Sequence, residues 1–173
     1  TVFNILFMPA SVLTLIYIVF RPLLTKMAIE WNAGRKKGFL KIVGMIFICL
    51  LGISIIVLGG SAWLGIPILS ILYGLDLSKY RMELLIMITG GCLCTFSYVF
   101  DNALIVIRRQ YLLLFSYVLS WIYIEIVIGK MVDKWGVLGA AFAYSTSMMV
   151  FLIVTFLIFI ICLRKDGKEL KEQ

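Results

Sequence analysis

Asp101 is the acidic residue with the most unusual position in this chain, because it lies several residues inside a long apolar segment. A carboxylate inside a membrane helix is costly unless it faces protein, water or a partner. At helical spacing its face carries small and polar residues, namely Gly90, Cys94, Ser97 and Tyr98. Asp101 therefore either lines a cavity and binds a proton, a cation or a sugar hydroxyl, or has a structural role. In the structural role it makes a hydrogen bond, or a salt bridge to Arg108 or Arg109.

Two more charged residues lie near aromatic side chains. Glu125 follows Tyr117 and Trp121 at four-residue spacing. A carboxylate beside aromatic rings resembles a sugar-binding surface, although a solvated glutamate near a helix end fits the pattern as well. Arg21 shares a helix face with Tyr17, and its planar donor fork suits a pyrophosphate group. The alternative is that Arg21 is only a charge that sets membrane topology.

Several kinds of chemistry are absent from the sequence. It contains no histidine, which removes His-based zinc sites and Ser-His or Cys-His catalytic pairs. The two Gly-Lys pairs, at 129–130 and 167–168, are followed by Met131 and Glu169, so neither ends an ATP-binding P-loop. All four cysteines lie in apolar stretches, where a thiol behaves as a small hydrophobe: Cys49, Cys92, Cys94 and Cys162. We expect no cofactor, no metal site and no enzymatic activity.

The composition indicates that lipid surrounds the elements that carry these residues. The chain is 63% apolar, whereas a soluble domain is about half apolar. Crossing the hydrocarbon core takes about 20 apolar residues, and five runs approach or exceed that length: 3–20, 42–64, 84–107, 111–129 and 137–163. Because only helices satisfy their own backbone in lipid within one segment, the predicted fold is all-α, a polytopic bundle of five transmembrane helices.

The segments between these runs add three expectations. Residues 66–74 are apolar but too short to span, and Pro67 interrupts them, so we expect a short interfacial or re-entrant helix there. Residues 164–173 are mostly polar and predict a tail. The chain starts at Thr1 and its first residues already have the character of a membrane helix, so we expect a fragment that lacks the N-terminal half of a longer protein.

The net charge of +7 is distributed between the apolar runs rather than along a stripe, so we expect no nucleic-acid partner. One set of connections and the tail hold twelve of the 16 lysines and arginines: Arg21, Lys26, Arg35, Lys36, Lys37, Lys41, Arg108, Arg109, Arg164, Lys165, Lys168 and Lys171. The opposite connections hold Lys79, Arg81, Lys130 and Lys134. The positive-inside rule then predicts that the first set and the C-terminus are cytoplasmic.

Four stretches resemble the bacterial oligosaccharide flippases of the polysaccharide transporter family. They are FNILFMPAS at 3–11, FRPLLTK at 20–26, LGIPILSILYG at 64–74 and WGVLGAA at 135–141. The family belongs with multidrug exporters to one superfamily, in which two helix bundles surround a central cavity and work by alternating access. The resemblance implies that the chain is most of the C-terminal bundle of a MATE-like fold.

The resemblance also implies a function. The implied function is export of an undecaprenyl-pyrophosphate-linked oligosaccharide across the bacterial plasma membrane, for the synthesis of capsule, O-antigen or exopolysaccharide. If this export is coupled to an ion gradient, the ion is a proton or sodium. Arg21 would be the counterpart of the cavity cations that meet the pyrophosphate, and Asp101 or Glu125 would take part in ion coupling. Three other functions stay open: a multidrug or cation antiporter of the same superfamily, a membrane-embedded glycan polymerase or transferase, and a structural membrane subunit.

Overall fold

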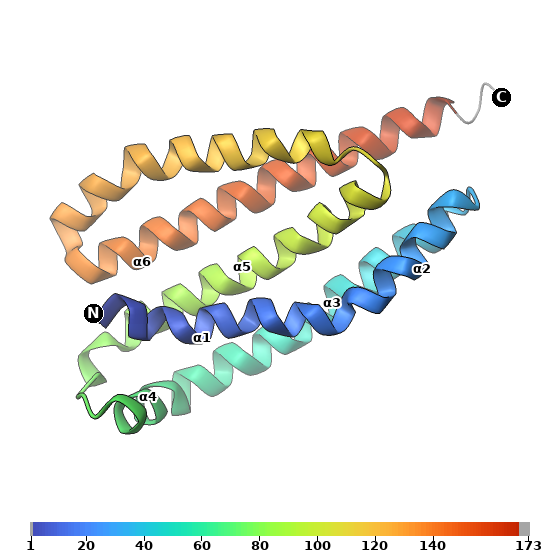
Figure 1. Cartoon of the computed structure of the whole chain (residues 1–173). Helices are drawn as coiled ribbons and strands as arrows, with labels where there is room; N and C mark the ends of the chain where they lie inside the picture. The colour runs from blue at the N-terminus through green and yellow to red at the C-terminus, as the bar shows by residue number, and fades with distance from the viewer. Residues whose placement is uncertain (1, 170–173) are drawn as a thin grey trace.

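The computed structural model describes the backbone of residues 2–169 and the side chains of residues 3–165, and within this range every regular element is a helix (Figure 1). Four helices are long and apolar enough to cross a membrane: Phe3–Asn32, Lys36–Tyr73, Ser78–Val106 and Gln110–Lys165. In chain order the elements are α1 (Val2–Ile16), a 3-10 turn (Tyr17–Phe20), α2 (Arg21–Asn32), α3 (Lys36–Gly60), a π-helical segment (Ser61–Gly65), α4 (Ile66–Tyr73), a 3-10 turn (Ser78–Tyr80), α5 (Arg81–Val106), a 3-10 turn (Gln110–Leu112) and α6 (Leu113–Glu169).

The largest difference from the sequence prediction is in α6, which contains the expected helix 111–129 from residue 113 onward and all of the expected helix 137–163. Its 57 residues would extend for about 85 Å if straight, far more than the roughly 30 Å of a hydrocarbon core. The helix bends at Gly136, where φ is 55° and ψ is −126°. Its two arms then run back along each other (Figure 1). Helical geometry resumes directly after this single glycine, so no loop separates the two expected helices.

The first expected helix, 3–20, continues beyond Phe20 into α2, which ends at Asn32. The junction is a 3-10 turn for a chemical reason. Pro22 has no N–H to donate to the carbonyl of Ile18, and the N–H of Arg21 bonds that carbonyl instead, which tightens the turn. As a consequence, the segment that we expected to be a cationic loop is largely helical.

The expected helices 42–64 and 66–74 are also joined directly. The short helix is present as α4, but a π-helical segment connects it to α3 without a break. In π geometry the carbonyl of Ala62 would face Pro67, which lacks a donor. The guanidinium of Arg81, at the start of α5, donates to this carbonyl. A Cβ on Gly65 would lie 2.8 Å from Leu84 Cδ2, so this glycine allows the segment to approach α5.

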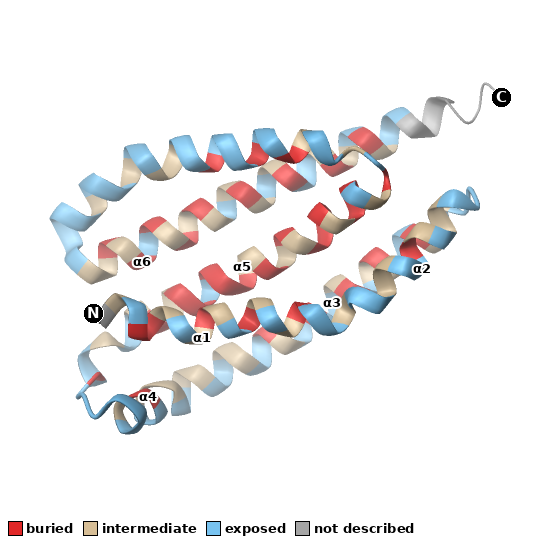
Figure 2. Ribbon diagram, in the orientation of Figure 1, coloured by how far each residue is buried: buried red, intermediate tan, exposed pale blue. Residues whose placement is uncertain are grey.

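Helix α5 is the centre of the bundle. In its most apolar stretch 56% of the residues are buried, against 22–28% in the other three spans, and Figure 2 shows this concentration of buried residues. Two adjacent glycines let its neighbours come close. A Cβ on Gly91 would lie 2.9 Å from the carbonyl oxygen of Ala10 in α1, and a Cβ on Gly90 would lie 2.6 Å from Tyr144 in α6. Helices α1 and α6 therefore pack on neighbouring faces of α5, about 100° apart around its axis, and Phe7 of α1 contacts Tyr144 of α6 with ring centroids 5.2 Å apart.

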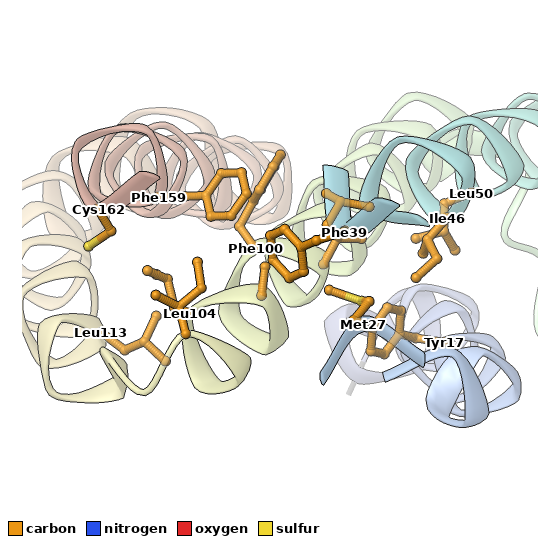
Figure 3. Close-up of a cluster of buried hydrophobic side chains, with 14 residues drawn as sticks. Tyr17, Met27, Phe39, Ile46, Leu50, Phe100, Leu104, Leu113, Phe159 and Cys162 are labelled. Carbon is orange, nitrogen blue, oxygen red and sulfur yellow. The ribbon is translucent and has the colours of Figure 1, made fainter. Parts of the chain in front are cut away.

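A cluster of buried side chains joins α2, α3, α5 and α6 (Figure 3). Phe100 lies in it with its ring centroid 5.4 Å from that of Phe159, and Phe39 lies 6.3 Å from Phe159. Large apolar side chains also cover much of the outer surface, where Val19 of the 3-10 turn after α1 and Ile56 of α3 are among the most exposed. Extended exposed apolar surfaces of this kind mark contact with lipid or with another protein.

The ends of the helices form two groups. The turn at 33–35, the turn at 107–112 and the last turns of α6 lie at one end of the bundle, and the turn at 74–80 and the bend of α6 lie at the other (Figure 1). The first end carries a group of the described cations, namely Arg35, Lys36, Lys37, Arg108, Arg109, Arg164 and Lys165. Of the expected tail, 164–173, the part up to Glu169 continues α6, and residues 170–173 lie outside the described residues.

Candidate functional site

The candidate site lies along α5, where Tyr98, Asp101 and Asn102 follow one another within about one turn. On the side of α1 and α2, Tyr98 and Asn102 border a cavity of about 300 Å³, here named the outer cavity. On the side of α6, Tyr98 borders a second cavity of about 180 Å³, named the inner cavity. The outer cavity is lined by Thr14, Leu15, Tyr17, Ile18, Arg21, Leu24, Tyr98 and Asn102. The inner cavity is lined by Cys94, Tyr98, Tyr117, Ser120, Met148 and Phe151.

Hydrogen bonds between the 3-10 turn that follows α1 and helix α5 form the wall of the outer cavity. The side-chain amide of Asn102 donates to the Tyr17 hydroxyl at 2.9 Å and to the Tyr98 carbonyl at 2.7 Å. The Tyr17 hydroxyl in turn donates to the same carbonyl at 3.2 Å. The rings of Tyr17 and Tyr98 lie 5.8 Å apart. The sequence analysis did not identify Asn102, although an amide in an apolar run directly after Asp101 is a signal that could have found it.

Arg21 lies on the rim of the outer cavity and its side chain is exposed. The tight turn that Pro22 imposes comes directly before Arg21 and keeps it next to Tyr17. Within residues 3–165 the Arg21 guanidinium has no hydrogen bond or ion pair to another side chain. Its donor fork is therefore available to an anionic group, such as a phosphate, which it can bind through charge-assisted hydrogen bonds.

Asp101 is buried on the α6 side of α5, with 5% of its surface exposed. The Tyr117 hydroxyl forms a hydrogen bond with its carboxyl group, and the Oδ1 atom has no partner among the described residues. The alternative of a salt bridge is not observed, because neither Arg108 nor Arg109 forms an ion pair with Asp101 in the described part of the chain. Arg109 instead donates to the Tyr111 hydroxyl at 3.3 Å.

Three hydroxyls in α6 resemble the Asp101 oxygen in being deeply buried without a hydrogen-bond partner among the described side chains. They belong to Ser116, Ser120 and Thr155, each at most 8% exposed. Ser120 lines the inner cavity, and Ser116 lies one helical turn before it. Thr155 lies one turn after the cavity residue Phe151. The sequence analysis did not identify them, although hydroxyl residues four positions apart in an apolar run are a recognisable signal.

The structure brings together some of the predicted site residues and separates others. Tyr98 and Tyr117 line the inner cavity, Tyr117 is hydrogen-bonded there to the buried Asp101, and Arg21 and Tyr98 line the outer cavity. Ser97 is buried, but its hydroxyl donates to the Leu93 carbonyl at 3.0 Å and is used within the helix. Glu125 is exposed and lines neither cavity, so it is not part of this site.

The acidic residues and cysteines that the structure describes do not gather into a metal site. Among the described residues no group of three or more histidine, cysteine, aspartate or glutamate side chains is close enough to hold a metal ion. Comparison of the chain with protein-family models, curated proteins and solved structures finds no match. The two cavities and the residues that line them are therefore the features of the chain that indicate a function.

Proposed function

We propose that the chain is part of a bacterial plasma-membrane transporter that moves an undecaprenyl-pyrophosphate-linked oligosaccharide from the cytoplasmic to the outer face, for surface polysaccharide synthesis. The observation that carries this proposal is the outer cavity, where the free guanidinium of Arg21 adjoins the hydroxyl and amide groups of Tyr17 and Asn102. A cation beside neutral hydrogen-bonding groups suits a substrate with a pyrophosphate and sugars. The resemblance of the four sequence stretches to oligosaccharide flippases supports the same substrate class.

In this proposal the two arms of α6 cross the membrane separately, which gives five crossings in the C-terminal bundle of a MATE-like fold. The turn at 33–35, the turn at 107–112 and the C-terminus are then cytoplasmic. The support is the charge distribution, because cations cluster at the end of the bundle that these three segments share. In this orientation Arg21, which lines the outer cavity, would be near the cytoplasmic leaflet from which the substrate arrives.

The test is reconstitution of the full-length protein in liposomes that contain a fluorescent undecaprenyl-pyrophosphate-linked glycan, with flipping followed by lectin access to the sugar. Arg21→Ala should lower the initial rate by about tenfold or more, because a hydrogen bond to a charged group contributes about 1.5–3 kcal/mol. Lys26→Ala is the matched control, since Lys26 is an exposed cation of α2 that does not line the cavity. Equal rates for the Arg21 variant and the control would contradict the proposal.

A second candidate is a multidrug or cation antiporter, and the observation that favours it is the buried Asp101 carboxyl with an unpaired oxygen. A carboxylate in this position can hold a cation or a proton during exchange. In that case the protein in liposomes should export cationic dyes when a pH gradient is applied, and Asp101→Asn should abolish export at unchanged membrane abundance. Dye export without lipid flipping would favour this candidate over the first.

A further inference from the structure

We propose that the inner cavity between α5 and the two arms of α6 is a binding site for a hydroxyl-bearing ligand group, namely one sugar unit. This inference deepens the proposed function, because it depends on a glycan being the transported cargo and names where one of its sugars binds. The site is separate from the Arg21 site of the outer cavity. Tyr98 is the one residue that lines both.

The polar atoms of this region require a partner. Buried polar groups in folded proteins are nearly always hydrogen-bonded, because leaving one unpaired is unfavourable. Here the Asp101 Oδ1 atom and the hydroxyls of Ser116, Ser120 and Thr155 have no partner among the described residues. Of these residues Ser120 lines the cavity and Asp101 is bonded to the lining residue Tyr117, while Ser116 and Thr155 lie one helical turn from Ser120 and Phe151. A hydroxyl that donates and accepts, with a carboxyl group that accepts, complements the hydroxyls of a sugar.

The apolar part of the lining fits the same ligand. The rings of Tyr117 and Phe151 lie 4.9 Å apart and both line the cavity, so they offer flat faces to the C–H face of a sugar ring. The volume of about 180 Å³ equals that of about six water molecules in the liquid, which is space for one sugar unit and not for a chain of them.

The site is also accessible. Tyr117 is 53% exposed although its hydroxyl is bonded to Asp101, so the cavity opens to the surface along this side chain. Cys94 lines the cavity and is partly exposed, and its thiol is hydrogen-bonded to Tyr98. The chain thus has a thiol inside the proposed site, and Cys49 on the outer face of α3 is an exposed thiol outside it.

These two thiols allow a test on the full-length protein in detergent. N-ethylmaleimide is added for varied times, and alkylation of each cysteine is measured by peptide mass spectrometry. Glucose, galactose and N-acetylglucosamine are added separately at high millimolar concentration, and glycine betaine, which has no hydroxyl, serves as the control solute. At least one sugar should slow alkylation of Cys94 fivefold or more, and no solute should change alkylation of Cys49. Ser120→Ala should remove the protection without changing the rate in the absence of sugar.

Three results would overturn the inference. Unchanged alkylation of Cys94 with every sugar would mean that the cavity takes water only. Equal protection by glycine betaine would mean that the effect is not recognition of hydroxyls. A Cys94 that stays unmodified even at alkaline pH, where its thiolate forms, would exclude the site, because a cavity that admits a sugar also admits this smaller reagent. The liposome flipping assay is independent, so protection without flipping would retain the sugar site and reject the transport proposal.

Discussion

The contact between Gly91 and Ala10 determines how α1 is placed on α5, and we predict that Gly91→Ala weakens it. A Cβ at position 91 would lie 2.9, 3.0 and 3.1 Å from three atoms of Ala10, two of them in the backbone. A carbon and a carbonyl oxygen in contact are separated by about 3.3 Å, so α1 must move away from α5 by about 0.4 Å. No side-chain rotation can relieve this contact, because a backbone oxygen is the closest atom.

The expected change in the free energy of unfolding of Gly91→Ala is the sum of two opposing contributions. Inserting a methyl group into a packed interface costs about 1–3 kcal/mol. Replacing glycine with alanine in a helix gains up to about 1 kcal/mol from helix propensity. Gly52→Ala in α3 isolates the second term, because a Cβ at position 52 has nothing within 4 Å. The free energy of unfolding of Gly91→Ala should therefore be about 1–3 kcal/mol lower than that of Gly52→Ala.

The assay is unfolding by sodium dodecyl sulfate in dodecyl maltoside micelles, followed by tryptophan fluorescence and circular dichroism on the full-length protein. Both variants are compared with the wild type in the same titration. If Gly91→Ala unfolds at the same detergent fraction as Gly52→Ala, then α1 does not contact α5 through Ala10 and Gly91. The two pairs Ala10–Gly91 and Tyr17–Tyr98 are each 81 positions apart in sequence, so they belong to one register between the first helix and α5. If the first contact is wrong, the placement of Tyr17 beside Tyr98 is therefore wrong as well.

Two further predictions concern the connection between α4 and α5. Arg81→Ala removes the donor to the Ala62 carbonyl, so the amides of α4 should exchange with deuterium several-fold faster, and Lys79→Ala, which removes a nearby cation, should leave exchange unchanged. Asp76 accepts hydrogen bonds from the Ser78 hydroxyl at 2.6 Å and from its backbone N–H at 3.0 Å, and these bonds lower the pKa of Asp76 below the ordinary 3.8. The stability that these hydrogen bonds contribute is complete above the ordinary pKa of Asp76, and it is lost as the pH falls through the lowered pKa of the folded protein. Ser78→Ala should therefore raise the pKa of Asp76 in an NMR titration, and an unchanged pKa would exclude these hydrogen bonds.

The sequence predicts the helices well, because a segment in lipid must satisfy its backbone internally and its apolar length is readable. It predicts the junctions poorly. Local geometry decides whether a helix ends or only changes its hydrogen-bonding pattern. Pro22 lacks an N–H, and a 3-10 turn forms just before it. Pro67 also lacks an N–H, but a π-helical segment precedes it. The left-handed φ of Gly136 likewise replaces a loop with a bend. Apolar runs show where helices lie and not how they are joined.

The functional face of α5 shows why a site on a central helix is only partly predictable. Successive residues of a helix differ by about 100°, so seen along the axis Asp101 lies about 60° to one side of Tyr98 and Asn102 about 40° to the other. The face expected from the sequence, with Cys94 and Asp101, is the one that meets α6. Asn102 instead meets Tyr17 in the turn that follows α1, and Tyr98 lies between the two directions and borders both cavities. Helical spacing orders these residues around the axis, but the directions of α1 and α6 come from close contacts at Gly91 and Gly90, which a single sequence does not reveal.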